Sequence, residues 1–157
     1  MRTIILPIDG PESLGAVSTA KDLAAKFAAR IVVVHVTRLQ PGARGAPIAT
    51  DPQENERKKV ARQLVHDLRQ AGVDAQLELR RSGLAHVADI IADIAQRHRA
   101  IAIVLASRGR SPFAAVLTSS VAQRLLHVAP CAVVAVTPKA AHAAAYESSD
   151  WRTVAAA

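Results

Sequence analysis

Short apolar runs rich in valine and isoleucine recur along the chain, and between them apolar residues return every three or four positions. Four of these runs predict strands buried on both faces of a sheet, because they hold almost no polar residues; they cover residues 3–8, 31–36, 101–105 and 131–136. A fifth run, at 75–79, alternates apolar and polar residues, which predicts a half-exposed strand at a sheet edge.

The stretches between the runs predict four helices. Ser13 is expected to cap the first helix, Pro52 fits the first turn of the second, and Gly72 ends the second. The apolar faces of the four helices cover residues 17–27, 60–71, 84–95 and 120–128.

Five strands alternating with four helices indicate an α/β fold with an open, doubly wound parallel sheet and helices on both faces. If the strand at 75–79 is outermost, the winding reverses between the first and fourth strands. Ligands of open α/β sheets bind at such a reversal, beyond the carboxyl ends of the strands. The loops after Ile8 and Leu105 are therefore expected to face each other across a site. We expect one domain over residues 1–138 and an alanine-rich tail over 139–157 that is mobile or packed on the surface.

Composition narrows the classes of function. The 157 residues include 20 Lys and Arg against 13 Asp and Glu, a net charge of +7, which raises the question of an anionic partner. The basic residues are spread along the chain and aromatic residues make up only 3% of it, so we expect solvated helix faces and no nucleic-acid partner. No apolar run reaches the ~20 residues of a membrane helix. The single Cys131 cannot form an internal disulfide, which is compatible with a cytoplasmic protein.

Unusual residues gather in the two loops that are expected to face each other. The first loop holds Pro7, Asp9 and Gly10. In the second loop, Arg108 and Arg110 add positive charge, Gly109 allows close approach to the backbone, and Ser120 opens the fourth helix, where an anion is favoured. The alternative reading is structural: a turn glycine, an N-cap serine and two solvated arginines.

From Thr3 to Val136 the sequence resembles the universal stress protein family. The resemblance rests on TIILPIDG at the start, VVVHV in the second strand and SRGRSPFAAVLTSSVAQRLLHVAPCAVVAV at the end. It implies the strand order 3-2-1-4-5, a dimer, and a cytoplasmic role in stress survival without a settled enzymatic reaction. The apolar edge from Cys131 to Val136 is expected to pair two copies of the chain, unless the tail folds back and covers it.

Nucleotide-binding members of this family carry Gly, two residues, Gly, nine residues, Gly and then Ser or Thr after strand four. The matching positions here are Ala106, Gly109, Ser119 and Ser120, so two of the three glycines are replaced. Residues similar to the family's adenine and ribose contacts are kept at Pro7, Asp9, Val36, Leu105, Ser120 and Val121. The resemblance thus implies an ATP site, with Mg only alongside ATP, whose base end is intact and whose phosphate end is altered. A side chain at 106 or 119 is tolerated at ordinary φ and weakens ATP binding at positive φ.

The chain shows no catalytic set. Its six histidines lack the spacing of metal ligands and have no Cys or carboxylate cluster beside them. His35 lies in a predicted buried strand, where we expect a hydrogen-bonded core histidine. We therefore predict a non-enzymatic stress-response module that binds adenine nucleotide. Three alternatives remain: a nucleotide-free dimeric scaffold that acts through partner proteins, an enzyme that cleaves ATP or transfers an adenylyl group, and a nucleic-acid binder.

Overall fold

The computed structural model describes residues 1–38, 53–83, 85–106 and 120–137. Helices and strands alternate along the chain, apart from one 3-10 helix, η1, after the first strand. The elements are β1 (Arg2–Pro7), η1 (Pro11–Ala16), α1 (Val17–Phe27), β2 (Ala29–Thr37), α2 (Glu54–Gln70), β3 (Ala75–Arg81), α3 (Val87–Arg97), β4 (Ala102–Ala106), α4 (Ser120–Val128) and β5 (Ala132–Val136).

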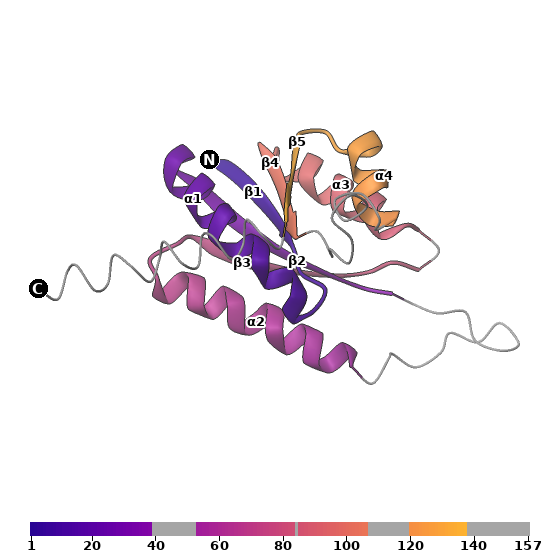
Figure 1. Cartoon of the computed structure of the whole chain (residues 1–157), viewed down its shortest axis with the longest axis horizontal. Coiled ribbons are helices and arrows are strands. Elements are labelled where there is room, and N and C mark those ends of the chain that lie inside the picture. The colour runs from indigo at the N-terminus through magenta and orange to yellow at the C-terminus, as the bar shows by residue number, and fades with distance from the viewer. Residues whose placement is uncertain (39–52, 84, 107–119, 138–157) are drawn as a thin grey trace, which may run out of the picture.

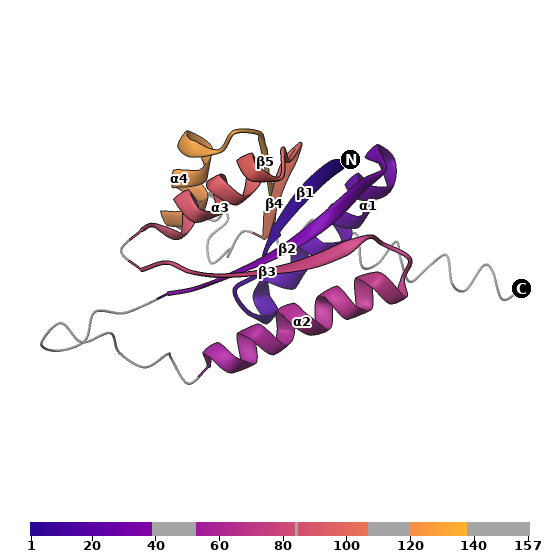
Figure 2. The same ribbon diagram turned by 180° about the vertical axis from the view of Figure 1, so that it is seen from behind.

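The strands form one parallel sheet in the order β3-β2-β1-β4-β5, with α1 and α2 on one face and α3 and α4 on the other (Figures 1 and 2). The predicted α/β fold, its doubly wound sheet and the order 3-2-1-4-5 are confirmed. The winding reverses between β1 and β4, which are neighbours in the sheet. Their carboxyl ends therefore open onto the same edge of the molecule.

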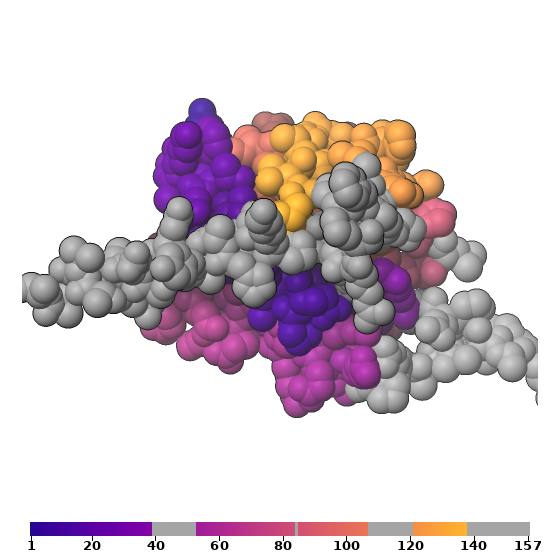
Figure 3. All heavy atoms as spheres, in the orientation of Figure 1, coloured from indigo at the N-terminus to yellow at the C-terminus, as the bar shows by residue number. Residues whose placement is uncertain are grey.

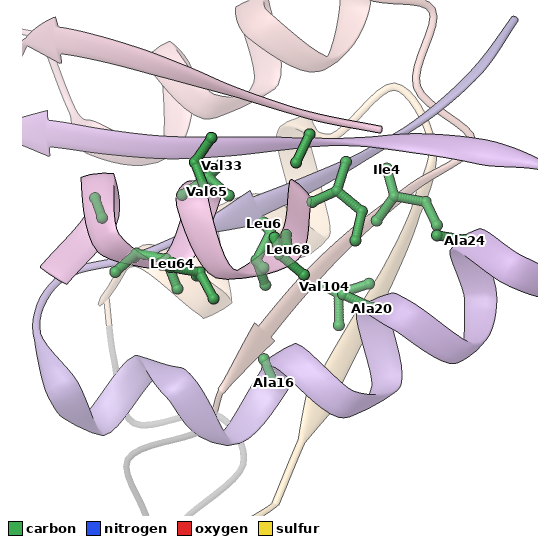
Figure 4. Close-up of a cluster of buried hydrophobic side chains, with 14 of the residues drawn as sticks. Ile4, Leu6, Ala16, Ala20, Ala24, Val33, Leu64, Val65, Leu68 and Val104 are labelled. Atoms are coloured by element: carbon green, nitrogen blue, oxygen red, sulfur yellow. The ribbon is translucent and has the colours of Figure 1, made fainter. Parts of the chain in front are cut away.

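The sheet is sandwiched between two apolar layers, because successive strand residues point to opposite faces. On the face of α1 and α2, Ile4, Leu6 and Val33 pack against alanines of α1 and against Leu64 and Leu68 of α2 (Figure 4). The opposite layer joins the alternate strand residues to α3 and α4; its buried members include Ile5, Val34, Ile91, Ile103 and Leu125. Burial on both faces fixes the strand register, since a slip of one residue would turn each apolar set to the wrong layer.

The chain turns sharply after β1. Gly10 has φ +108°, a backbone conformation that residues with a Cβ rarely adopt, so the position favours glycine. Pro11 then begins η1 at once. The expected cap at Ser13 is wrong for this reason: Ser13 lies inside η1, and its hydroxyl accepts a hydrogen bond from the Asp9 amide at 3.0 Å.

The edge strand β3 departs from simple alternation at Glu78. The alternating pattern predicts an exposed side chain, but Glu78 is buried. Its carboxylate accepts hydrogen bonds from His98 and Arg97 at the end of α3, at 2.8 and 3.1 Å, and pairs with Arg80. The end of α3 thus covers this part of β3, and three basic groups replace the water that the carboxylate loses.

The other edge strand, β5, is half-exposed along most of its length, and the α4–β5 region reaches the surface in the space-filling view (Figure 3). Cys131 lies just before it, is partly buried, and burial raises the pKa of its thiol. Within the described ranges, no helix is long and apolar enough to cross a membrane. The predicted tail at 139–157 lies outside the described residues.

Candidate functional site at the carboxyl edge of the sheet

Three neighbouring strands bring the predicted base-contacting residues to one edge. Pro7 ends β1 and Asp9 follows it, Val36 lies near the end of β2, and Leu105 and Ala106 end β4. Val36 and Leu105 are buried in the layer beneath α3 and α4, whereas Asp9 keeps 36% of its side chain exposed. The fold therefore provides an apolar floor with one carboxylate beside it.

The predicted phosphate end is described only in part. Arg108, Gly109 and Ser119 lie outside the described residues. Ser120 begins α4, as the sequence predicts, and Val121 in the first turn of α4 packs on the same layer as Leu105. The described half of the site is thus the half that corresponds to base and ribose contacts in the resemblance.

A cavity of about 650 Å³ opens between the end of β3, the start of α3 and α4. Its volume lies in the range of small-molecule sites, roughly 300–1,000 Å³. Val121 lines it, as does Arg38, the residue after β2. Besides these, its wall has apolar and basic members, including Val87, Val128, His86, Arg124 and His127. A flat apolar ring and an anionic group would both find complementary surface there.

Asp9 is held in place through its backbone and faced by two arginines. The Ser13 hydroxyl fixes its amide. Its carboxylate lies 3.8 Å from a guanidinium nitrogen of Arg38 and 3.9 Å from one of Arg57 on α2. Both distances exceed hydrogen-bonding range, and such partly exposed pairs are worth little energetically. The two arginines add positive charge beside this carboxylate.

Beneath Asp9 lies a buried polar cluster. His35 on β2 is 1% exposed and Glu54, the first residue of α2, is 3% exposed. One ring nitrogen of His35, Nδ1, lies 2.8 Å from the carbonyl oxygen of Ile8, and the other, Nε2, lies 2.7 Å from Oε1 of Glu54. Thr37 donates a hydrogen bond to the same oxygen, and Lys58 Nζ lies 3.4 Å from it. The prediction that His35 is a hydrogen-bonded core histidine is confirmed.

The cluster keeps Glu54 ionised. Burial alone raises the pKa of its carboxyl group, but the hydrogen bonds from Thr37 and His35 and the charges of His35 and Lys58 outweigh it. The pKa of Glu54 consequently lies below its ordinary value of 4.5. A buried carboxylate here ties the start of α2 to the end of β1, and so to Asp9.

The far wall of the cavity is tied together by one ion pair. Arg124 on α4 donates two hydrogen bonds to Asp89 on α3, at 2.7 and 2.9 Å. These bonds lower the pKa of Asp89 and raise that of Arg124. A bidentate pair fixes the direction of the guanidinium, so α3 and α4 hold a constant spacing at this wall.

Sequence reasoning missed site residues in the loop after β3, on α4 and on α2. Ser82, His86, Arg124 and His127 line the cavity, and Glu54 contacts His35 in the buried cluster, yet none belongs to a recognisable motif. One signal was available: a Ser-Gly pair directly after a strand marks a loop at the carboxyl edge. Among the described residues, no group of three or more His, Cys, Asp or Glu is arranged to hold a metal ion.

Comparisons with known proteins agree with this architecture. A sequence model described as the universal stress protein family matches residues 1–137. A search of the curated proteins finds no match.

Several solved structures share the fold. A universal stress protein from Archaeoglobus fulgidus superposes with a TM-score of 0.66 at 24% identity, covering 87% of this chain and 98% of the other. The universal stress protein from the same organism in complex with dAMP gives 0.62 at 22% identity, with 87% and 97% covered. A family member from Arabidopsis thaliana with AMP bound gives 0.56 at 15% identity, with 87% and 92% covered. At these identities the likeness supports the fold alone.

Proposed function

Since the chain belongs to the universal stress protein family, we propose that it is a non-enzymatic stress-response module of the cytoplasm that binds an adenine nucleotide beside Asp9. The main support for the proposal is that the family-like contact residues and a cavity lie at the same edge of the sheet. The residues similar to the family's adenine and ribose contacts gather at the carboxyl edge, next to a cavity of about 650 Å³. Relatives with the same fold hold dAMP and AMP.

The lining of this edge suits the parts of a nucleotide. Val121 lines the cavity and offers an apolar surface against which a purine ring would lose water, with Val36 and Leu105 buried in the same layer. The Asp9 carboxylate is a hydrogen-bond acceptor suited to a ribose hydroxyl or an exocyclic amine. Arg38 is the cation that we propose for a first phosphate, because it both lines the cavity and faces Asp9.

The number of phosphates is the open part of the proposal. ATP, with Mg only alongside it, is the ligand that the family resemblance implies. Ala106 and Ser119 replace two glycines of the signature, which favours a weaker grip on the second and third phosphates. We therefore expect AMP to lose less affinity than ATP relative to members that keep all three glycines.

Isothermal titration calorimetry with AMP and with ATP, with and without magnesium, tests the proposal. Micromolar to submillimolar binding of either nucleotide supports it, and GTP serves as the control for base selectivity. Absence of heat and of any NMR shift at millimolar AMP and ATP would contradict it. Steady conversion of ATP to ADP or AMP by the purified chain would instead favour the enzyme.

We further propose that two copies associate through β5. Four of its five residues are not fully buried, although all are alanine or valine, and an apolar edge of this kind favours pairing with another strand. Sedimentation velocity of the full chain should give a dimer, and Val134→Lys, in the middle of the strand, should give a monomer. A monomer at high concentration in the unmodified chain would overturn this part.

A second candidate function is a dimeric scaffold that binds no nucleotide and acts on partner proteins. The replaced glycines at 106 and 119 favour it. The two candidates separate in one comparison: a nucleotide-dependent change in sedimentation or in partner capture supports the binding module, whereas identical behaviour with and without millimolar AMP or ATP supports the scaffold.

A further inference from the structure

We propose that His35 is doubly protonated inside the protein and that its ion pair with Glu54 positions Asp9, which faces the cavity residue Arg38, so that loss of the His35 proton loosens the segment that carries Asp9. The effect on nucleotide affinity rests on the function proposed above. His35 is here a positioning residue, because it acts on the ligand through Ile8 and Asp9 and does not itself line the cavity.

The partner of Nδ1 requires a proton on that nitrogen. Nδ1 lies 2.8 Å from the carbonyl oxygen of Ile8. A carbonyl oxygen only accepts hydrogen bonds, so at this distance the ring must donate. This contact alone is satisfied by a neutral ring with its proton on Nδ1.

The partner of Nε2 requires a second proton. Nε2 lies 2.7 Å from Oε1 of Glu54, and the same oxygen receives a hydrogen bond from Thr37 and the charge of Lys58. An oxygen that accepts from the Thr37 hydroxyl and faces the Lys58 ammonium is a carboxylate oxygen, and a carboxylate only accepts. Both ring nitrogens therefore donate, and the ring carries a positive charge next to the negative charge of Glu54. The depressed pKa of Glu54 agrees with this charge state.

Removal of one proton leaves no satisfactory arrangement. If the remaining proton stays on Nδ1, a lone pair on Nε2 faces a carboxylate oxygen at 2.7 Å. If it moves to Nε2, a lone pair on Nδ1 faces the Ile8 carbonyl at 2.8 Å. Two acceptors at such a distance repel, so one contact has to open. Either the start of α2 or the segment that carries Asp9 then moves.

Whichever of the two contacts opens, the change reaches the candidate site. Ile8 immediately precedes Asp9, and Glu54 begins the helix whose Arg57 faces the Asp9 carboxylate. Around the ring, Glu54 and Lys58 on α2 form the contacts nearest to Nε2, and Asp9 after β1, faced by Arg38 after β2 and Arg57 on α2, follows the Ile8 carbonyl at Nδ1. Of these, Glu54 directly contacts the ring.

Glu54→Gln is the matched variant, because it removes the charge and keeps the shape. An amide nitrogen in place of Oε1 donates one proton to Nε2 and one to the Thr37 hydroxyl, which then accepts, so the ring is satisfied with a single proton on Nδ1. The variant should therefore keep the fold and lose the sensitivity to pH. His98 is the control within the same chain, since its Nδ1 accepts a hydrogen bond from Arg30.

The first measurement reads the protons directly. In ¹⁵N NMR spectra of the unmodified chain at neutral pH, both ring nitrogens of His35 should give protonated shifts, whereas in Glu54→Gln only Nδ1 should. A single protonated nitrogen on His35 in the unmodified chain would overturn the proposal, whatever the nucleotide affinity.

The second measurement tests whether His35 positions the segment that carries Asp9 and the start of α2. As pH rises through the point where His35 loses its proton, exchange of the Asp9 and Arg57 amides, corrected for intrinsic rates, should increase roughly three- to tenfold. The Ile101 amide, bonded to Thr3 at the opposite edge, should not change. AMP affinity should fall by a similar factor at the same pH, and Glu54→Gln should show neither change.

Unchanged Asp9 and Arg57 exchange across the His35 titration would refute the coupling. Failure of AMP to bind at any pH would contradict the proposed function alone, since the proton and exchange readouts need no ligand.

Discussion

Two histidine–glutamate pairs lie in the part of the chain that the structure describes, and they differ in the partner of the second ring nitrogen. In both, Nε2 faces a carboxylate: Glu54 for His35 at 2.7 Å and Glu78 for His98 at 2.8 Å. Nδ1 of His35 faces a carbonyl oxygen, whereas Nδ1 of His98 receives a hydrogen bond from the guanidinium of Arg30 at 3.1 Å. The first ring must therefore donate twice, and the second donates once and accepts once.

This difference assigns different tasks to two similar contacts. His98 joins the end of α3 to β2 and β3 toward the amino ends of the strands, where it supports the fold. His35 joins β1, β2 and α2 at the carboxyl edge, where the candidate ligand contacts gather. The neighbour of Nδ1 therefore decides whether that nitrogen donates or accepts.

The largest expected contrast is in stability. Glu54→Ala removes one partner of a buried pair and should lower the free energy of unfolding by about 3 kcal/mol or more. Glu78→Ala should cost less, about 1–2 kcal/mol, because its partners Arg80 and Arg97 are more than 40% exposed and stay hydrated. Urea unfolding of both variants measures the contrast. Equal losses would mean that burial does not distinguish the two pairs.

Ligand affinity should separate the two edges next. Asp9→Asn removes the carboxylate at the cavity and should lower AMP affinity roughly tenfold, the loss expected when a charged hydrogen bond is weakened. Asp22→Asn, on the exposed face of α1, is the control and should leave calorimetric affinity unchanged. Equal affinities of the two variants would remove Asp9 from the site.

Acid should weaken both pairs through their glutamates. At Glu78, burial on its own raises the pKa, but the hydrogen bond from His98, the charge of Arg80 and the contacts with Arg97 outweigh it, so its pKa, like that of Glu54, lies below 4.5. A group whose pKa is depressed by folding adds stability above its unfolded pKa and loses it as pH falls through the folded value. The Tm of the unmodified chain should therefore fall as the pH drops below 4.5.

Glutamine variants test whether the loss of Tm in acid comes from the carboxyl groups of Glu54 and Glu78. Glu54→Gln and Glu78→Gln should each show a shallower loss of Tm on acidification than the unmodified chain. A decline that is unchanged in both variants would contradict the assignment of acid sensitivity to these two carboxyl groups.

Salt should produce the smallest contrast. The arginines around Glu78 are partly in solvent, so 1 M NaCl should reduce the cost of Glu78→Ala by screening, by up to about half. The cost of Glu54→Ala should stay constant, because its partners are buried. Unfolding free energies at low and high salt check this. Equal screening would indicate that water reaches the His35 cluster.

Much of the fold could be predicted from the sequence, because buried strands and helix faces require apolar residues in a regular pattern. Apolar runs such as those around Ile31 and Ile101 occur where helices cover both faces of a strand, and α4 begins at Ser120 and ends at Val128, as its pattern predicts. The position of the site follows from topology, since the winding reverses at β1 and β4.

The polar interior could not be read in the same way. Glu54 stands in the charged run ENERKK, typical of a solvated helix start, and becomes buried because His35 and Thr37 lie beneath it in space, 19 and 17 residues away in sequence. Glu78 fits the exposed phase of an alternating strand and is buried because the end of α3 covers it. The burial of Glu54 and of Glu78 depends on packing between distant segments, which the local pattern of apolar and polar residues does not reveal.

The most direct test of the account is an NMR titration of the full chain with AMP. Binding should shift the amides of Asp9, Val36, Leu105 and Val121 first and most, and leave the amides of Thr3 and Arg30 at the amino ends of the strands unmoved. Shifts concentrated around Arg30 and His98, with Asp9 unchanged, would place the ligand at the wrong edge and contradict the account.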